Sequence, residues 1–266
     1  MNQHQFVFIG GLHRSGTSIL FKCLKDHPQI SGFRSTDVPE DEGQHLQSVF
    51  SPAKVYGGSG RFGFNKASFL DETSELVSPE NARTIFAEWH PYWEMEKHFL
   101  LEKSPPNLVR SRFLQALFPN SHFVILLRHP IATAYATKKW RSKMPVHKLI
   151  EHWLICHEQF ERDRRYLRSV IILKYENFVA NPEQVMDEIC TLLGIEHVPL
   201  NRDIHSHIND KYFAQWQKLY QGLISRLYVR YIIYKFEARA TRFGYSLQNL
   251  EWLGPKTIPR LAALYA

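Results

Sequence analysis

The chain has 266 residues, 44% of them hydrophobic, which is ample for a packed core and predicts one folded domain over residues 1–266. Its net charge is +7, but the sequence contains no block of six like charges and no repeat of basic and aromatic residues. We therefore expect no nucleic-acid partner. No apolar run is long enough to span a bilayer and no signal peptide is evident, so we expect a cytoplasmic protein without a membrane partner. Three widely spaced cysteines, Cys23, Cys156 and Cys190, argue against a disulfide framework or a zinc site.

Apolar runs that alternate with amphipathic segments define the expected elements. Buried strands are expected at residues 6–12, 98–104, 121–130 and 169–175. Helices are expected at residues 15–26, from 78 onward, 107–117, from 130 onward, 146–168, 182–193 and 219–240, with irregular segments at 28–50 and 51–76. Strands that are near-continuous apolar runs and alternate with helices predict an α/β fold. Its P-loop-like central parallel sheet would be flanked by helices on both faces, with a ligand at the carboxyl ends of the strands.

The segment FVFIGGLHRSGTSILFKCL, residues 6–24, has the outline of a phosphate-binding loop, in which a strand enters a glycine-rich turn and leaves as a helix. Its backbone N–H groups would surround an anion at the helix N-terminus. Arg14 would add a planar, permanently charged fork suited to phosphate or sulfate oxygens. The candidate cofactor-binding residues of this loop are His13, Arg14, Ser15, Gly16, Thr17 and Ser18. The plain alternative is an ordinary strand–turn–helix joint.

Two features separate this loop from that of nucleotide hydrolases and kinases. Those enzymes place a lysine directly after the second glycine, where this chain has Thr17, and hold Mg²⁺ with a carboxylate at the end of a neighbouring strand. Here the strand at 122–127 ends in Arg128, which would repel a metal and attract a second anionic group. We therefore expect no metal and a ligand with two anionic ends.

Five segments, in this order along the chain, resemble motifs of the sulfotransferases that use 3′-phosphoadenosine 5′-phosphosulfate (PAPS). HRSGTS resembles the 5′-phosphosulfate loop in the arginine-containing form of tyrosylprotein and many bacterial sulfotransferases. LEKSPPN, at 101–107, resembles the Glu-Lys-Thr-Pro segment of heparan sulfotransferases, and VILLRHPIATAYAT resembles the 3′-phosphate motif. LKYENFVANPEQVMDEICTLLGI resembles the family's Tyr-Glu-Asp-Leu segment and its following helix. NDKYFAQW, at 209–216, lies where the family closes a basic segment over the nucleotide.

The resemblance implies PAPS as the sulfuryl donor and the 3′,5′-bisphosphate PAP as the product, with roles for particular residues. Arg14 and Lys103 would meet the charge that develops at the transferring group, and Arg128 would bind the 3′-phosphate. Tyr175 would pack near adenine or else belong to the core. Lys211 would meet the 3′-phosphate or else lie on the surface.

Two positions depart from the family pattern. Ala136 stands where the 3′-phosphate motif has a serine, and Pro105 stands where cytosolic aryl sulfotransferases have a catalytic histidine. The general base must therefore come from elsewhere. In sulfotransferases with an arginine-containing loop, a glutamate soon after the strand that follows the first helix takes the acceptor's proton, so the resemblance implies the acidic stretch at 36–47, TDVPEDEGQHLQ, as the source. We rank Glu42 first and Glu40 second as the catalytic base. The other candidates are Asp37, Asp41 and His45, and the alternative is a solvated acidic turn.

The predicted function is sulfuryl transfer from PAPS to a hydroxyl or amine of a small-molecule acceptor. The carboxylates around the base favour a neutral or cationic acceptor, such as a nitrogenous natural product of secondary metabolism. One alternative is a non-catalytic nucleotide-binding protein on the same fold, which Ala136 keeps open. The other is a P-loop kinase, and no oligomeric state is predicted.

Overall fold

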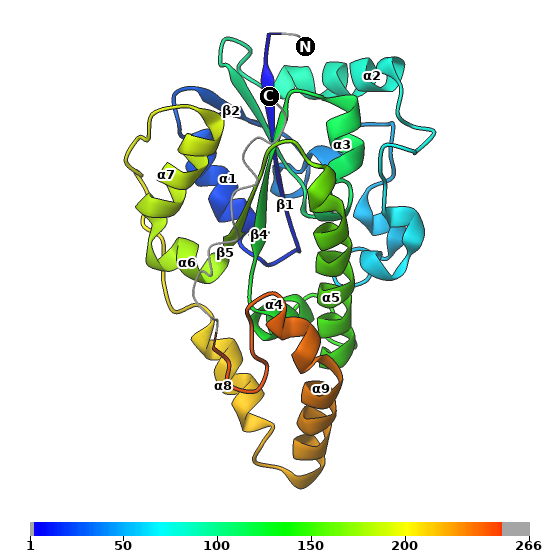
Figure 1. Cartoon of the computed structure of the whole chain (residues 1–266), viewed down its shortest axis with the longest axis vertical. Helices are drawn as coiled ribbons and strands as arrows, with labels where there is room; N and C mark the ends of the chain where they lie inside the picture. The colour runs from blue at the N-terminus through cyan, green and yellow to red at the C-terminus, as the bar shows by residue number, and fades with distance from the viewer. Residues whose placement is uncertain (1–2, 252–266) are drawn as a thin grey trace.

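The computed structural model describes residues 3–251, and one five-stranded parallel sheet lies in that range (Figure 1). Its strands are β1 Gln5–Gly11, β2 Ile30–Gly32, β3 Phe99–Lys103, β4 Ser121–Leu127 and β5 Val170–Lys174, in the spatial order β2-β3-β1-β4-β5. The predicted α/β fold with a central parallel sheet is confirmed. Sequence analysis misses β2, because three residues are too few to show a strand pattern.

Helices cover both faces of the sheet, as the apolar strands predict. The helices of the described residues are α1 Thr17–Lys25, α2 Pro79–Trp89, α3 Ser111–Leu117, α4 Pro130–Lys138, α5 Val146–Asp163, α6 Tyr175–Ala180, α7 Pro182–Leu193, α8 Asp210–Lys218 and α9 Leu223–Thr241. Figure 1 shows α1, α6 and α7 on one side of the sheet and α2, α3 and α5 on the other. The remaining helices, α4, α8 and α9, lie beyond the carboxyl ends of the strands.

Local chemistry explains where two of the helices begin. Ser78 is the N-cap of α2, and its hydroxyl accepts a hydrogen bond from the Asn81 N–H at 3.1 Å. The helix predicted from residue 107 begins only at Ser111, because Pro105–Val109 forms a 3-10 turn with prolines in its first positions. The short helices α6 and α8 are not predicted from the sequence.

The described residues contain no helix that is long and apolar enough to cross a membrane. The three cysteines are buried and free. Burial raises the pKa of the Cys156 thiol well above its usual range, so this thiol is protonated and unreactive at neutral pH.

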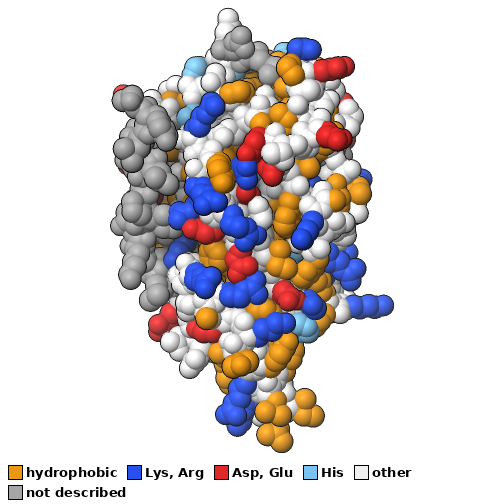
Figure 2. Space-filling view, turned by 45° about the vertical axis from the view of Figure 1, so that its right-hand side comes forward, with side chains coloured by type: hydrophobic (Ala, Val, Ile, Leu, Met, Phe, Trp, Pro, Cys, Tyr) orange, Lys and Arg blue, Asp and Glu red, His pale blue; other side chains and the backbone are white. Residues whose placement is uncertain are grey.

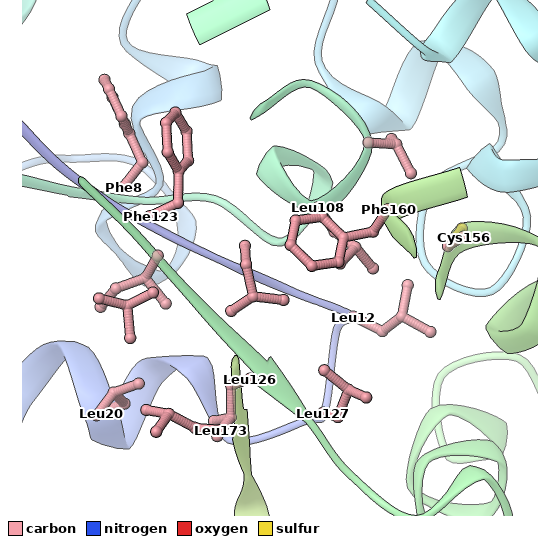
Figure 3. Packing of buried hydrophobic residues seen from close by; sticks show 14 of the residues in the cluster. Phe8, Leu12, Leu20, Leu108, Phe123, Leu126, Leu127, Cys156, Phe160 and Leu173 are labelled. Carbon is pink, nitrogen blue, oxygen red and sulfur yellow. The ribbon is translucent and has the colours of Figure 1, made fainter. Parts of the chain in front are cut away.

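The hydrophobic core packs against both faces of the sheet (Figure 3). On one face Phe8 of β1 lies opposite Phe123 of β4, with ring centroids 5.6 Å apart. On the other face Leu126 of β4 pairs with Leu173 of β5, and both lie near Leu20 of α1. Because both faces are covered, the strands are near-continuous apolar runs instead of alternating between apolar and polar residues.

The register of the sheet brings the carboxyl ends of its central strands together. Lys103, the last residue of β3, lies opposite Ile9 of β1. Gly11, the last residue of β1, lies opposite Leu126 of β4, and the same alignment continues into β5. The residues that follow these strands therefore converge at one edge of the sheet, which is where ligands bind in open parallel sheets.

Gly16 occupies a position that a side chain would disrupt in two ways. Its φ is 101°, and a Cβ at this position would lie 2.4 Å from the ring of Tyr175. Gly194 has a comparable positive φ of 70°, but nothing lies within 4 Å of its added Cβ. We expect Gly194→Ala to lower the free energy of unfolding by about 1 kcal/mol through backbone strain alone. Gly16→Ala should cost roughly 1–3 kcal/mol more through overlap with Tyr175. Urea unfolding measures both losses, and equal losses would contradict this account of the loop.

Candidate active site

The glycine-rich turn joins β1 to α1 at the carboxyl edge of the sheet. Arg14, with φ 70°, and Gly16, with φ 101°, turn the chain from the strand into the helix. The N–H groups in the first turn of an α-helix have no partner within the helix. Thr17 and Ser18 are the first residues of α1, so their N–H groups have no partner within the helix.

Two side chains of the turn take other partners than the predicted phosphate. The Ser15 hydroxyl and the Ser15 N–H both donate to the Leu12 carbonyl, at 2.6 and 3.0 Å, and so they close the turn. The His13 ring lies 5.9 Å from the Phe62 ring and lines a small cavity together with His152. Burial lowers the pKa of His13 to about 4, so this ring is neutral at pH 7. The ring of His13 therefore faces the small cavity shared with His152 and packs near Phe62.

Arg14 lies at the exposed mouth of the loop. Its guanidinium stacks over the Trp140 ring, 4.7 Å from the ring centroid, while its carbonyl accepts a hydrogen bond from Arg128 Nη1 at 2.8 Å. The stacking partner carries no charge, so the positive charge of Arg14 is available to an anion. The backbone of Arg14 is fixed while its side chain faces the solvent.

Arg128 follows β4 and is 5% exposed. Besides its bond to Arg14, it donates from Nε and Nη2 to Asn209 Oδ1, at 2.9 and 2.7 Å. Among the described residues these bonds use three of its five N–H groups, which leaves two for an anion. The Tyr175 ring lies 4.2 Å from the guanidinium and packs under Gly16, so Tyr175 is a core residue that supports both. The prediction that Tyr175 packs near adenine finds no contact to support it, because the ring is only 4% exposed.

Asn209 is itself held by the buried carboxylate of Glu176. Asn209 Nδ2 donates to Glu176 Oε1 at 2.8 Å, and the His129 N–H donates to the same oxygen at 2.9 Å. The Tyr245 hydroxyl donates to Glu176 Oε2 at 3.0 Å. Both oxygens of Glu176 accept hydrogen bonds in this buried network, and Asn209 is fixed by it. Arg128, which donates to Asn209, is therefore held in one orientation.

Three further positions surround the ring of Tyr212 on α8. The ammonium of Lys211 lies 5.3 Å from this ring and that of Lys139 lies 5.8 Å from it. The same ring lies 5.6 Å from the Arg128 guanidinium. Lys211 is thus an exposed lysine at the edge of the arginine site. Ala136 is buried against Tyr212, so the small side chain leaves room for this ring where the family pattern has a serine.

Lys103 and Glu42 meet at the end of β3. Lys103 has 0% exposure, and its Nζ donates to the Glu40 carbonyl at 2.7 Å and lies 3.3 Å from Glu42 Oε1. Glu42 is 6% exposed, and His45 Nε2 lies 3.9 Å from its other oxygen. Of the predicted base candidates, Glu42 is the carboxylate that the structure brings into contact with Lys103.

The other acidic candidates point away from this pair. The side chains of Glu40 and Asp37 are exposed, and Asp41 accepts a hydrogen bond from the Thr36 hydroxyl. Glu40 and Asp41 have positive φ values of 56° and 51°, and this turn directs Glu42 inward. Glu40 therefore contacts Lys103 through its backbone carbonyl and not through its carboxylate. A negative field around the acceptor, predicted from the acidic stretch, is not supported by these contacts.

Hydrogen bonds hold the segment that carries Glu42 against the end of β3. The Gly43 N–H donates to Glu102 Oε1 at 2.9 Å, and the Gln44 N–H donates to Ser104 Oγ at 3.0 Å. The side-chain amide of Gln44 donates to Glu42 Oε2. A Cβ at Gly43 would lie 2.6 Å from Glu102 Cγ, so the close approach requires glycine here.

Sequence analysis misses the residues that position the predicted ones. Asn209, Glu176, Glu102 and Gln44 all lie inside quoted segments, but their bonds join residues that are between 33 and 81 positions apart. No pattern of spacing within one segment could reveal such pairs. The described residues contain no group of three or more His, Cys, Asp and Glu side chains placed to hold a metal.

Comparison with curated proteins finds relatives that span more than this chain. Protein-tyrosine sulfotransferase 2 of Gallus gallus is 26% identical over 199 residues, which cover 71% of this chain and 51% of that protein. Protein-tyrosine sulfotransferase 1 of Danio rerio is 22% identical over 211 residues, which cover 76% and 55%. The chain thus spans about half the length of the curated relatives that it matches.

Solved structures share the fold at low identity. The sulfotransferase domain of the Synechococcus PCC 7002 olefin synthase has a TM-score of 0.53 and 20% identity, covering 79% of this chain and 87% of that one. The sulfotransferase domain from the curacin biosynthetic pathway has a TM-score of 0.50 and 16% identity, covering 80% and 90%. The model of the Sulfotransferase family matches residues 6–199, a range that includes the glycine loop, Glu42, Lys103 and Arg128. The chain therefore belongs to the sulfotransferase family.

Proposed function

We propose that the protein transfers a sulfuryl group from PAPS to a hydroxyl or amine of a small-molecule acceptor. The observation that carries this proposal is the buried contact of Lys103 with Glu42 beside the glycine loop. An ammonium at this point can meet the charge that builds on a leaving phosphate, and a carboxylate next to it can take the proton of an acceptor. Membership of the sulfotransferase family supports the same reaction.

The nucleotide side offers the groups that a donor with two anionic ends requires. The N–H groups of Thr17 and Ser18 and the guanidinium of Arg14 fit the 5′-phosphosulfate end. The two remaining N–H groups of Arg128 fit the 3′-phosphate, and Lys211 adds a second cation nearby. When bound, PAPS supplies the sulfuryl group and PAP leaves.

In this reaction Glu42 acts as the general base. Its carboxylate accepts the proton of the acceptor hydroxyl or amine as that atom bonds to sulfur, and the proton ends on Glu42. Lys103 holds the Glu42 carboxylate in place and, with Arg14, stabilises the negative charge that develops on the leaving phosphate. Preorganised donors of this kind commonly contribute about 10²–10³ in rate.

For the acceptor we propose a neutral small molecule of secondary metabolism. Lys103 already pairs with the Glu42 carboxylate, so a positive charge on the acceptor brings no advantage. Protein tyrosine is the second candidate, because both curated relatives are named for this acceptor. Their name also favours a hydroxyl over an amine.

Turnover with labelled PAPS and a panel of phenols, alcohols, amines and tyrosine peptides tests the proposed function. A sulfated product identifies both the reaction and the acceptor class. Binding of PAP without turnover across the panel would favour the non-catalytic alternative. Phosphoryl transfer from ATP that requires Mg²⁺ would favour the kinase alternative.

Glu102 is a positioning residue in this proposal, since it holds Gly43 and so the backbone that carries Glu42. It is 1% exposed and also accepts hydrogen bonds from the Ser104 hydroxyl, at 2.6 Å, and from Asn107 Nδ2. Burial outweighs these three donors and raises the pKa of Glu102 to about 7. The carboxyl group is therefore partly protonated at neutral pH.

The first prediction concerns Arg128. We expect the wild-type protein to bind PAP at least about tenfold more tightly than adenosine 5′-monophosphate, since a hydrogen-bonded charged contact is worth roughly 1.5–3 kcal/mol. Arg128→Ala should remove most of this ratio, as measured by isothermal titration. Arg162→Ala, an exposed arginine on α5, is the matched control and should keep the ratio. An Arg128→Ala protein with the wild-type ratio would contradict the assignment.

The second prediction concerns the base. Glu42→Gln keeps the shape of the side chain and removes the proton acceptor, so kcat should fall roughly 10²-fold or more. The affinity for PAP should stay nearly unchanged. Glu40→Gln and Asp37→Asn are matched controls with exposed carboxylates and should retain turnover. If all three variants turn over normally, the base lies elsewhere, and His45 is then the next candidate.

The third prediction concerns the pH dependence of stability. The pKa of Glu102 is raised from 4.5 to about 7, so between these values the folded state holds a proton that the unfolded chain has released. This group therefore makes the fold less stable as the pH rises through that window. Relative to Glu102→Gln, which cannot titrate there, the wild-type unfolding free energy should fall by roughly 1.4 kcal/mol per pH unit. Urea unfolding of both proteins at several pH values measures this difference, and a constant difference would show that the carboxyl group is charged throughout.

A further inference from the structure

The helices α8 and α9 form a hairpin that projects beyond the carboxyl ends of the strands (Figure 1). Its second helix is apolar on two opposite sides. The buried side consists of Val229, Ile232, Phe236 and Ala240. The exposed side, which we name the α9 stripe, consists of Leu223, Ile224, Leu227, Tyr231 and Tyr234. An apolar side of a helix is normally covered, whereas in the part of the chain that the structure describes the α9 stripe is open to solvent.

The exposure of the α9 stripe is large for apolar side chains. Leu223 is 76% exposed, Ile224 84% and Tyr234 92%. Among the described residues, half of the ten large hydrophobic side chains that are exposed belong to this stripe. Figure 2 shows hydrophobic side chains gathered at the lower tip of the molecule, with basic side chains beside them. Contiguous exposed apolar groups of this kind mark an interaction surface.

The charged side chains of the hairpin from residue 211 to residue 236 have one sign. Between residues 211 and 236 the sequence contains five Lys and Arg residues and no Asp or Glu. Arg226 and Arg230 are exposed beside the stripe, and Lys235 lies 3.6 Å from Glu151 of α5. Apolar and aromatic side chains flanked by cations are the composition of helices that lie on anionic membrane surfaces.

The turn that carries the tip is well organised by hydrogen bonds. The Ser225 hydroxyl donates to the Leu219 carbonyl at 2.6 Å, and the Arg226 N–H donates to the Gly222 carbonyl at 2.9 Å. Arg226 Nε donates to the Tyr220 carbonyl at 3.1 Å. These bonds present Leu223 and Ile224 outward, so their exposure follows from an ordered turn.

We propose that the α9 stripe binds the surface of an anionic lipid bilayer, a property beyond the proposed sulfuryl transfer and contrary to the expectation of no membrane partner. Leu223, Ile224 and Leu227 would enter the region between headgroups and acyl chains, while Arg226 and Arg230 would meet the anionic headgroups. A second copy of the chain is a poorer occupant, because it would bring cations of the same sign against each other. The bilayer neutralises these cations and covers the apolar side chains at once.

Sedimentation of the full chain with lipid vesicles tests this proposal without an acceptor or PAPS. We expect binding to vesicles of phosphatidylcholine mixed with phosphatidylglycerol, and far weaker binding to phosphatidylcholine alone or at high salt. The triple variant Leu223→Ser, Ile224→Ser and Leu227→Ser should lower the partition coefficient by about tenfold or more. The double variant Arg226→Gln and Arg230→Gln should lower it by a comparable factor and remove most of its salt dependence.

The matched control replaces exposed valines elsewhere, with Val55→Ser and Val198→Ser in one protein, and should bind as the wild type does. Because the replaced side chains are exposed, unfolding midpoints should stay close to that of the wild type, and the double arginine variant should lose only the bond of Arg226 to the Tyr220 carbonyl. Absence of binding to anionic vesicles, or equal binding by the serine variant, would overturn the proposal. A dimer seen by analytical ultracentrifugation that the serine variant dissolves would assign the α9 stripe to a second copy instead.

Discussion

The contact between Lys103 and Glu42 places the strongest constraint on this structure. Both side chains are almost fully buried, and a buried charge is costly unless an opposite charge and hydrogen bonds surround it. The segment with Glu42 must therefore fold over the end of β3. Two consecutive positive φ angles at Glu40 and Asp41, and a glycine at position 43, allow it to do so. The backbone of an irregular segment is thus set by the need to satisfy one lysine.

The same rule applies on the nucleotide side, with arginine in place of lysine. Arg128 is buried, and its bonds to Arg14 and Asn209 join the glycine loop to the residue before α8. Glu176 balances this charge through Asn209 and not by direct contact. That indirect pairing is chemically useful, because a carboxylate bonded directly to the guanidinium would occupy the N–H groups that a phosphate needs.

Much of the fold and part of the site could be predicted from the sequence, for physical reasons. Apolar runs report burial on both faces of a sheet, so β1, β3, β4 and β5 were predictable, and strand ends carry ligands in such sheets. Arg14, Lys103 and Arg128 follow from that rule. The role of Asn209 was not predictable, because only tertiary contact brings it to Arg128. For Ser15 the sequence predicted a ligand contact that the structure does not favour, because the Ser15 hydroxyl donates to the nearby Leu12 carbonyl.

Adjacent residues at the end of α4 contact both halves of the proposed site. Trp140 stacks on Arg14 of the nucleotide loop, while Arg141 donates to the carbonyls of Ser59 and Gly57 at 3.1 and 2.9 Å. The segment that Arg141 holds runs directly into Phe62, which packs against His13. Arg14 and the segment before Phe62 thus rest on neighbouring side chains, Trp140 and Arg141, of one helix end. Because Ser59 and Gly57 belong to an irregular segment held by a side chain and not by the sheet, the shape of this segment is less constrained than that of the strands.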